Sequence, residues 1–183
     1  MDAAAHLRGM TDDVIDAVPE ADDPLVEHFI ARFQLSGVPL HLPYSDRGYD
    51  PNFCHLSAKH CAMTHGGRRV HGWALWKFED QLVGEHHSVW ENPVGELIDV
   101  TPPKFGADRI LFVRDDIADL VEMNGVYVMW ADRTTIPHVP FAFQGEQIHK
   151  PNWGLLPDNA NITSFCNKFG LSSSDMLTDE RFG

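Results

Sequence analysis

Basic residues are scarce in this sequence, and their scarcity argues against one large class of partners. The 183 residues include 14 Lys and Arg against 27 Asp and Glu, which gives a formal net charge of −13. Contacts to phosphate groups need clustered basic side chains, and the only tight basic cluster is Arg68-Arg69. We therefore expect no nucleic-acid partner.

Long apolar runs and abundant cysteine are also missing. No window approaches the ~18 apolar residues that a membrane-spanning helix needs. The first ten residues lack the basic start and apolar stretch of a secretory signal. The three cysteines, Cys54, Cys61 and Cys166, form an odd number, which favours reduced thiols over a disulfide framework. We expect a soluble, cytoplasmic protein with no membrane partner.

Familiar cofactor motifs are absent as well. The chain contains no Cys-x-x-Cys pair and no His-Glu-x-x-His sequence, and its glycines form no phosphate-binding pattern. The first expectation is therefore a protein without a bound cofactor.

What is present suffices for one folded domain. The chain is 43% hydrophobic, so it can bury a sizeable core, and 183 residues fit one domain better than two. Composition and pattern divide it into an N-terminal helical region (1–45), a core (46–131) and a C-terminal arm (132–183) that wraps the core.

Hydrophobic periodicity predicts an α+β domain with an antiparallel sheet of about five strands against a cysteine-bearing helix. Residues 38–52 are expected to form a loop. The expected helical segments are 11–18, 25–35, 53–64, 115–123 and 164–169. The expected strands are 70–78, 82–90, 96–101, 109–113 and 126–131.

Three residues in the core region suggest thiol chemistry. Cys54 lies in the first turn of a predicted helix, where unpaired backbone N–H groups and the helix dipole favour a thiolate. If Asn92-Pro93-Val94-Gly95 turns the chain, residues whose numbers sum to about 187 pair across a hairpin. His87 then lies within one position of Asp99, close enough for a hydrogen bond. Asp99 would orient His87, and His87 would accept the Cys54 proton.

Each of these residues also has a purely structural interpretation. Cys54 can be a small buried hydrophobe, and His87 can be a core histidine satisfied by one carbonyl. Asp99 can cap the backbone near Thr101.

The order of these residues resembles the papain-like and transglutaminase-like superfamily of thiol hydrolases. The similar stretch runs from Asn52 to Pro103, with His87-Ser88-Val89-Trp90 on one strand and Asp99-Val100-Thr101-Pro102 ending the next. Similar segments occur in uncharacterised bacterial and phage proteins. The resemblance implies that Cys54 is a nucleophile, His87 a base and Asp99 an orienting residue.

The same resemblance implies thiol-dependent acyl transfer: hydrolysis, deamidation or transamidation of an amide or ester. The substrate would be a small molecule, a peptide or a protein. No Gln precedes Cys54 to stabilise an oxyanion, so Asn52 or the Cys54 backbone N–H would serve. His86 and Trp90 are further candidate supporting residues.

Two alternatives remain open at this point. His60 and Cys61 on the helix, with His86 or His87 on the strand, could bind Zn²⁺ or Fe²⁺, although adjacent strand residues point to opposite faces. The chain could instead be a non-catalytic binding module, with a groove lined by its five tryptophans: Trp73, Trp76, Trp90, Trp130 and Trp153.

Overall fold

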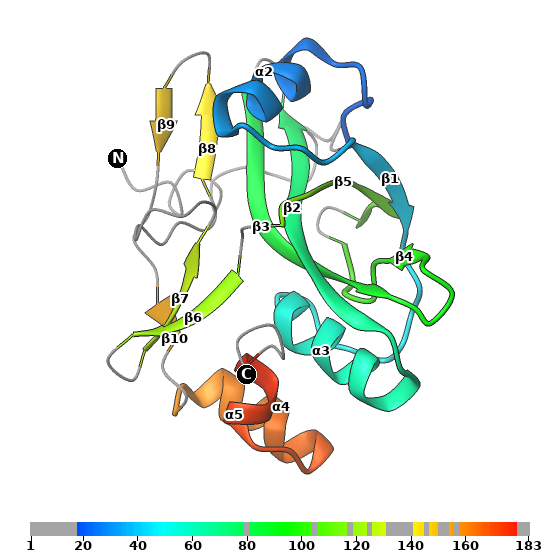
Figure 1. Ribbon diagram of the computed structural model, residues 1–183, viewed down its shortest axis with the longest axis vertical. Helices are drawn as coiled ribbons and strands as arrows, with labels where there is room; N and C mark the ends of the chain where they lie inside the picture. The colour runs from blue at the N-terminus through cyan, green and yellow to red at the C-terminus, as the bar shows by residue number, and fades with distance from the viewer. Residues whose placement is uncertain are drawn as a thin grey trace.

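The computed structural model shows an α+β protein built on an antiparallel sheet, as expected (Figure 1). It describes residues 18–78, 81–103, 106–116, 119–123, 126–130, 141–144, 147–149, 154–155 and 158–178. The strands of the main sheet are β1 (Leu40–Pro43), β2 (Arg68–Phe78), β3 (Gln81–Glu91), β4 (Leu97–Ile98), β5 (Arg109–Arg114), β8 (Phe141–Gln144) and β9 (Gln147–His149).

The main sheet has seven strands in the order β1-β5-β2-β3-β8-β9, with β4 pairing to β3 beside this path. Four of them, β2 to β5, correspond to the predicted strands 70–78, 82–90, 96–101 and 109–113, whereas the fifth predicted strand, 126–131, belongs to a second sheet. Strands β8 and β9 come from the region expected to wrap the core, and they extend the sheet beyond β3. The C-terminal part of the chain therefore contributes to the sheet itself.

A second, three-stranded sheet overturns one helix prediction. It contains β6 (Asp119–Met123), β7 (Val126–Trp130) and β10 (Gly154–Leu155), in the order β10-β7-β6. The predicted helix at 115–123 is wrong because β6 pairs antiparallel with β7, and the sequence Asn124-Gly125 between them is typical of a hairpin. Asp115 does not cap a helix, since its side chain accepts a hydrogen bond from Trp73 Nε1 at 3.0 Å.

Two further differences lie next to each other. Strand β1 forms inside the predicted loop 38–52, at the edge of the sheet, where Pro43 can end a strand without a missing hydrogen bond. Strand β4 is much shorter than the predicted strand 96–101. Its pairing with β3 ends at Ile98, and the next residue, Asp99, forms a parallel bridge with Tyr44 instead. The helical turn predicted at 11–18 lies almost wholly outside the described residues.

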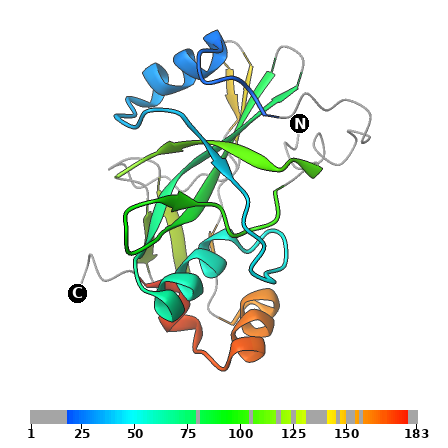
Figure 2. The same cartoon turned by 90° about the vertical axis from the view of Figure 1, so that its right-hand side faces the viewer.

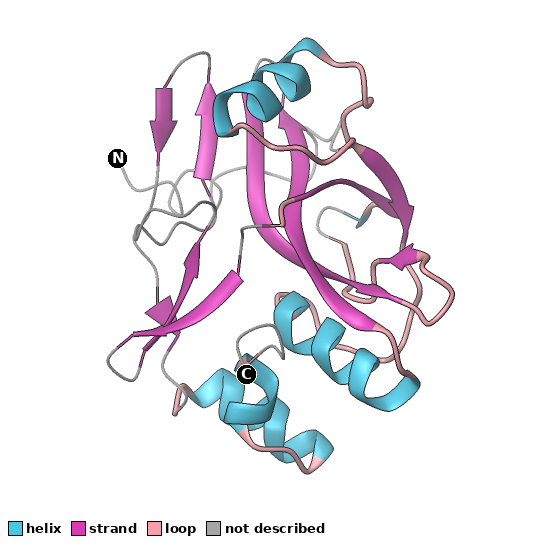
Figure 3. Cartoon of the chain, viewed as in Figure 1, coloured by secondary structure: helices cyan, strands magenta, loops and turns pink. Residues whose placement is uncertain are grey.

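The helices lie at opposite ends of the main sheet, as Figure 2 and Figure 3 show. Helix α2 (Pro24–Phe33) begins at Asp23, whose side chain accepts from Leu25 N, and its buried residues Val26 and Phe29 pack on the sheet. Helix α3 (Cys54–His65), together with α4 (Ala160–Phe169) and α5 (Ser173–Leu177), covers the other end. None of the helices in the described part of the chain has the length and apolar character needed to cross a membrane.

The long β2–β3 ladder separates two faces of the main sheet. Because side chains alternate along a strand, the register His71↔Ser88 and Trp73↔His86 puts these four residues on one face. His87 pairs with Gly72 and therefore lies on the opposite face. Neighbouring residues of β3 thus belong to different environments, and this division organises the candidate site.

Candidate active site

The candidate site forms beside a stretch of β3 that lacks a strand on one side. Strand β8 pairs with β3 at residues 82–84, and β4 pairs with it at residues 90–91. Among the described strands, none pairs on that side with residues 85–89. This stretch includes His87.

Helix α3 begins at Cys54, the position expected for a thiol nucleophile. The N-cap residue is Phe53, and no side chain makes a capping hydrogen bond there. The start of the helix therefore offers backbone N–H groups that no side chain has satisfied. Cys54 itself is 6% exposed, so its thiol is shielded from bulk water.

His87 and Asp99 are joined by a hydrogen bond in the interior. His87 Nε2 lies 3.1 Å from Asp99 Oδ1, and the same oxygen accepts from Thr101 N at 3.0 Å. The predicted contact between His87 and Asp99 is therefore present. Asp99 also accepts a backbone bond from Ser45 N and donates one to Pro43 O, so its position is fixed from both sides.

The register of the hairpin differs by one residue from the prediction. Trp90 pairs with Ile98 and Glu91 with Leu97, so paired numbers sum to 188. Continued by one step, this register sets Asp99 opposite Val89, which makes His87 its diagonal neighbour on the same face. Diagonal neighbours are within reach of long side chains, which explains why the contact forms despite the shift.

Cys54 and Asp99 act on the same imidazole. Burial alone would lower the pKa of His87, but the nearby Cys54 sulfur and the Asp99 carboxylate, which is hydrogen-bonded to the ring, raise it well above its usual value. Since Nε2 faces Asp99, Nδ1 is the nitrogen left for the thiol. Two groups that favour the imidazolium are thus collected around one histidine.

Buried polar atoms without a geometrically satisfied hydrogen bond gather around this set. Four of the five such atoms among the described residues are Ser57 Oγ, His87 Nδ1, Asp99 Oδ2 and Thr101 Oγ1, and the fifth, His86 Nε2, lies on the opposite face of β3. Folded proteins leave few such atoms, and each one calls for an explanation. Here Nδ1 and Oδ2 belong to the candidate base and its orienting residue, Thr101 binds Asp99 through its backbone, and Ser57 lies one helical turn from Cys54.

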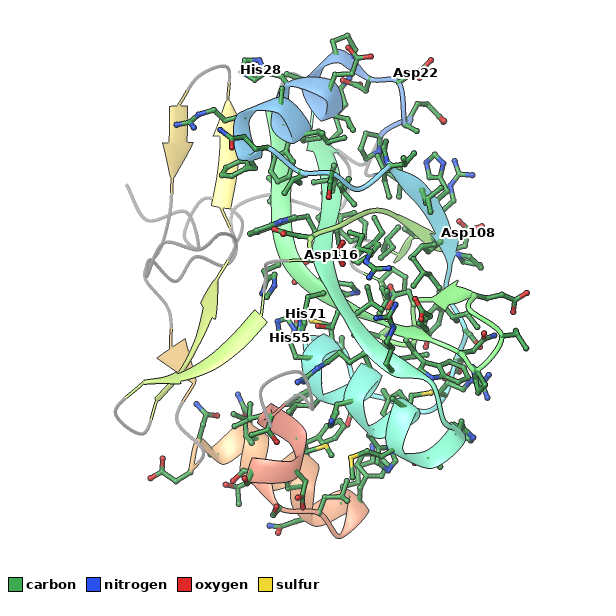
Figure 4. All side chains as sticks on the ribbon, viewed as in Figure 1. Asp22, His28, His55, His71, Asp108 and Asp116 are labelled. Carbon is green, nitrogen blue, oxygen red and sulfur yellow. The ribbon has the colours of Figure 1, made fainter. Side chains whose placement is uncertain are left out.

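The opposite face of β3 carries a second set of histidines, of which only His86 was among the predicted site residues. His55 Nδ1 and His71 Nδ1 contact the same Ser88 hydroxyl at 2.6 and 2.8 Å. The His86 ring lies 4.9 Å from that of His55 and 5.6 Å from that of His71. Figure 4 shows His55 and His71 close together at the start of α3. His86 therefore faces away from His87, as strand alternation predicted.

Within this histidine cluster, the surroundings of His55 favour its uncharged form. Burial lowers the pKa of His55 well below its usual value, and the neighbouring His86, His71, Arg69 and His87 lower it further. Cys54 and His55 are adjacent in α3, yet their surroundings differ. Cys54 lies near His87, whose charged form is favoured, whereas the charged form of His55 is disfavoured. Alternation along β2 and β3 could have predicted that His71 and Ser88 are opposite each other, but not that His55 lies above them.

The predicted supporting residues have different positions. Asn52 is exposed just before α3, with a left-handed backbone conformation at φ 69°. Trp90 is buried, donates from Nε1 to Gly66 O at 2.9 Å, and its ring lies 5.5 Å from the Arg47 guanidinium. Trp90 therefore stabilises the end of α3, whereas Asn52 is an exposed residue two positions before Cys54 in the sequence.

The alternative metal set is not gathered into one site. His86 and His87 lie on opposite faces of β3, and His60 Nδ1 contacts the Tyr49 hydroxyl at 2.7 Å. Cys61 is fully buried in the apolar cluster around Tyr49. Within the described ranges, no group of three or more His, Cys, Asp or Glu side chains is arranged to hold a metal ion.

The tryptophans of the binding-module alternative do not line a groove where the structure describes them. Trp73, Trp76 and Trp90 are at most 5% exposed and belong to the hydrophobic core. Trp130 and Trp153 have no described side chains. Comparison of the chain with protein-family models, with curated proteins and with solved structures gave no significant match.

Proposed function

We propose that the protein catalyses thiol-dependent acyl transfer, with Cys54 as nucleophile, His87 as base and Asp99 as the residue that orients the base. The observation that carries the proposal is the convergence of Cys54 and Asp99 on His87, which raises the pKa of that buried imidazole. A structural histidine needs only one hydrogen-bonding partner, whereas a base between a thiol and a carboxylate needs this geometry.

The chemistry follows from the positions of the atoms. His87 Nδ1 takes the proton of Cys54, and the sulfur attacks the carbonyl carbon of an amide or ester. The developing oxyanion is stabilised by backbone N–H groups at the uncapped start of α3, with Asn52 beside them. His87 then protonates the leaving group. Water or an amine attacks the thioester, which releases the acyl group and restores the thiol.

The arrangement is also what the papain-like and transglutaminase-like resemblance leads one to expect. A cysteine begins a helix that packs against an antiparallel sheet, a histidine lies on one strand, and an aspartate follows the next. We therefore assign the core to that superfamily as part of the proposal. Peptides, proteins and small molecules with an amide or ester bond remain the substrate classes to test.

The first test measures the reactivity of the three cysteines with iodoacetamide between pH 6 and 7. Burial raises the pKa of both Cys61 and Cys166, so these thiols should react slowly, whereas Cys54 should react fast. Peptide mass spectrometry of the alkylated protein gives the three rates separately. Equal, slow labelling of all three cysteines contradicts the proposal.

Matched variants distinguish a catalytic role of Cys54 from a structural one. Cys54→Ser should abolish the burst of nitrophenol from p-nitrophenyl acetate, whereas Cys61→Ser should retain it. His87→Gln keeps a donor near Asp99 but removes the base, so acylation should slow by roughly 10²-fold or more. A variant that folds as the parent does, by circular dichroism, and keeps its acylation rate without His87 would sink the assignment of the base.

A further inference from the structure

A buried hydrogen bond joins the two residues that directly follow the nucleophile and the base. His55 follows Cys54 at the start of α3, and Ser88 follows His87 on β3. His55 Nδ1 lies 2.6 Å from Ser88 Oγ, and both residues are buried. Since the Cα atoms of consecutive residues are about 3.8 Å apart, this bond connects the two backbone segments that carry Cys54 and His87.

The start of α3 thereby meets both faces of β3. Cys54 is near His87 on one face, and His55 contacts Ser88 on the other. The contacts fall within residues 85–89, where none of the described strands pairs with β3 on one side. Two contacts on opposite faces of one strand limit how far the first turn of α3 can rotate or slide along it.

His71 completes a network around the Ser88 hydroxyl. Its Nδ1 lies 2.8 Å from Ser88 Oγ, and the two residues are paired between β2 and β3. A serine hydroxyl has one hydrogen to donate, so Ser88 donates to one of the two imidazoles and accepts from the other. His55, His71 and Ser88 are all buried, and breaking the network would leave polar atoms unsatisfied in the interior. The hydroxyl therefore links α3 to both β2 and β3.

The backbone of His55 is held by a residue of β2 as well. Arg69 is 5% exposed and donates from Nη1 to His55 O at 2.9 Å. The same nitrogen donates to Met176 O, also at 2.9 Å, near the end of α5. No side chain in the described part of the protein caps α3 at Phe53, so contacts with other elements fix its first turn.

We propose that His55 and Ser88 are positioning residues that fix the distance between the Cys54 sulfur and His87 Nδ1. The inference rests on the proposed thiol chemistry, because it gives a role to the neighbours of the nucleophile and the base. Both residues act through the backbones of α3 and β3 and do not contact the reacting atoms. Proton transfer requires hydrogen-bond distance, and a displacement of about 1 Å can slow a reaction roughly 10²-fold. The network therefore affects the rate of acylation rather than the binding of the ester.

The test compares Ser88→Ala with the parent in the burst of nitrophenol from p-nitrophenyl acetate, over a range of ester concentrations. Ser88→Ala removes the hydroxyl that both imidazoles contact. We expect the maximal acylation rate to fall about tenfold or more, while the ester concentration at half-maximal rate changes by less than about twofold. NMR titration should show a lower pKa for His87 in this variant, because the Cys54 sulfur that raises the pKa is displaced.

Two variants of His55 separate the hydrogen bond from the packing of the ring. The side-chain amide of Asn reaches the position of Nδ1, so His55→Asn should keep the acylation rate within about threefold of the parent. His55→Leu fills the space but loses the bond, so it should be as slow as Ser88→Ala. Because the two residues act as one unit, the double variant should be no slower than either single variant.

The control for a general loss of stability is Val26→Ala. It removes buried methyl groups from α2, at the end of the sheet opposite α3 (Figure 1). This variant should unfold more readily than the parent and still keep the parent's acylation rate and His87 titration.

The outcomes distinguish the two proposals. If the parent gives a burst that depends on Cys54, but Ser88→Ala and His55→Leu acylate as fast as the parent, the network does not position the catalytic pair. The same holds if the His87 titration is unchanged in Ser88→Ala, or if Val26→Ala is slowed equally. If the parent gives no burst, the thiol chemistry itself is wrong. Folding is checked by circular dichroism, and if Ser88→Ala does not fold, the comparison of His55→Leu with His55→Asn decides.

Discussion

His87 differs from the buried His55 in the protonation state that its surroundings favour. Burial opposes a charge on any imidazole, and at His55 that opposition prevails because the neighbouring groups are histidines and an arginine. At His87 the effect of burial is outweighed by the nearby Cys54 sulfur and the Asp99 carboxylate, and the pKa of His87 is raised. A buried group whose charge is stabilised by two partners is typical of a functional site.

Replacing the carboxylate should remove part of that stabilisation. Asp99→Asn keeps an oxygen for Thr101 N but loses the negative charge, so the pKa of His87 should fall. Histidine resonances followed by NMR across the pH range give this pKa directly. Alkylation of Cys54 at pH 6 to 7 should slow about tenfold or more, since the imidazole loses its orienting partner.

The control for this variant is Asp108→Asn, which removes a carboxylate from the exposed surface (Figure 4). It should leave both the His87 titration and the Cys54 rate as they are in the parent. A His87 titration that is the same in Asp99→Asn and the parent would contradict the role given to Asp99.

At this scale the sequence predicted part of the site. Cys54, His87 and Asp99 could be selected because a helix start, strand alternation and a turn each follow local rules. The cluster of His55, His71 and Ser88 could not be predicted, because it depends on which face of the sheet α3 covers. That choice is set by packing between segments distant in the sequence.

At the scale of the elements, strand β2 packs closely between its neighbours because Gly72, opposite His87, has no side chain. Gly72 lies directly opposite His87, and β5 approaches it closely from the other side. A Cβ atom on Gly72 would lie 2.3 Å from Val113 O and 2.5 Å from a ring carbon of Phe112. Both distances are far below van der Waals contact, so only glycine allows this approach of β5 to the strand that faces His87.

Gly72→Ala should therefore be strongly destabilising. We expect a loss of roughly 2 kcal/mol or more in the free energy of unfolding, because backbone and a core ring must both move. Urea denaturation measures it. The control is Gly95→Ala, where nothing lies within 4 Å of the added Cβ and only the positive φ of 88° opposes the change. That control should cost roughly 1 kcal/mol. Equal losses in the two variants would contradict the close packing of β5.

The elements show why some predictions held and others were wrong. The bounds of β2, β3, α2 and α3 were predicted within two residues. Helix α2 has a clear periodic pattern, whereas α3 was identified by its lack of Gly and Pro and by Gly66-Gly67 at its end. The helix predicted at 115–123 is absent, and Asp115 instead accepts a hydrogen bond from the buried Trp73 indole. The shortness of β4 reflects the bridge from Asp99 to Tyr44, a pairing that no local pattern of the sequence contains.

For the whole molecule, the two perturbed histidines predict opposite effects of pH on stability. His55 has a lowered pKa when folded, so unfolding takes up a proton once the pH falls below about 6.5, and stability falls with it. His87 has a raised pKa when folded, so its contribution is complete below about 6.5 and is lost as the pH rises through the folded value. Stability should therefore decline on both sides of a maximum near neutral pH.

Two variants test which histidine causes the loss of stability at low pH and which causes the loss at high pH. His55→Asn keeps a polar atom near Ser88 but cannot titrate, so stability should fall less steeply than in the parent between pH 6.5 and 5. His87→Gln keeps a donor near Asp99 and should flatten the decline above pH 7. One proton changes the slope of the free energy of unfolding by up to about 1.4 kcal/mol per pH unit, which urea denaturation at half-unit steps can resolve. If His55→Asn loses stability in acid as steeply as the parent, the neutral histidine cluster is not the source of the acid decline. If His87→Gln keeps the alkaline decline, the charge on His87 does not stabilise the fold.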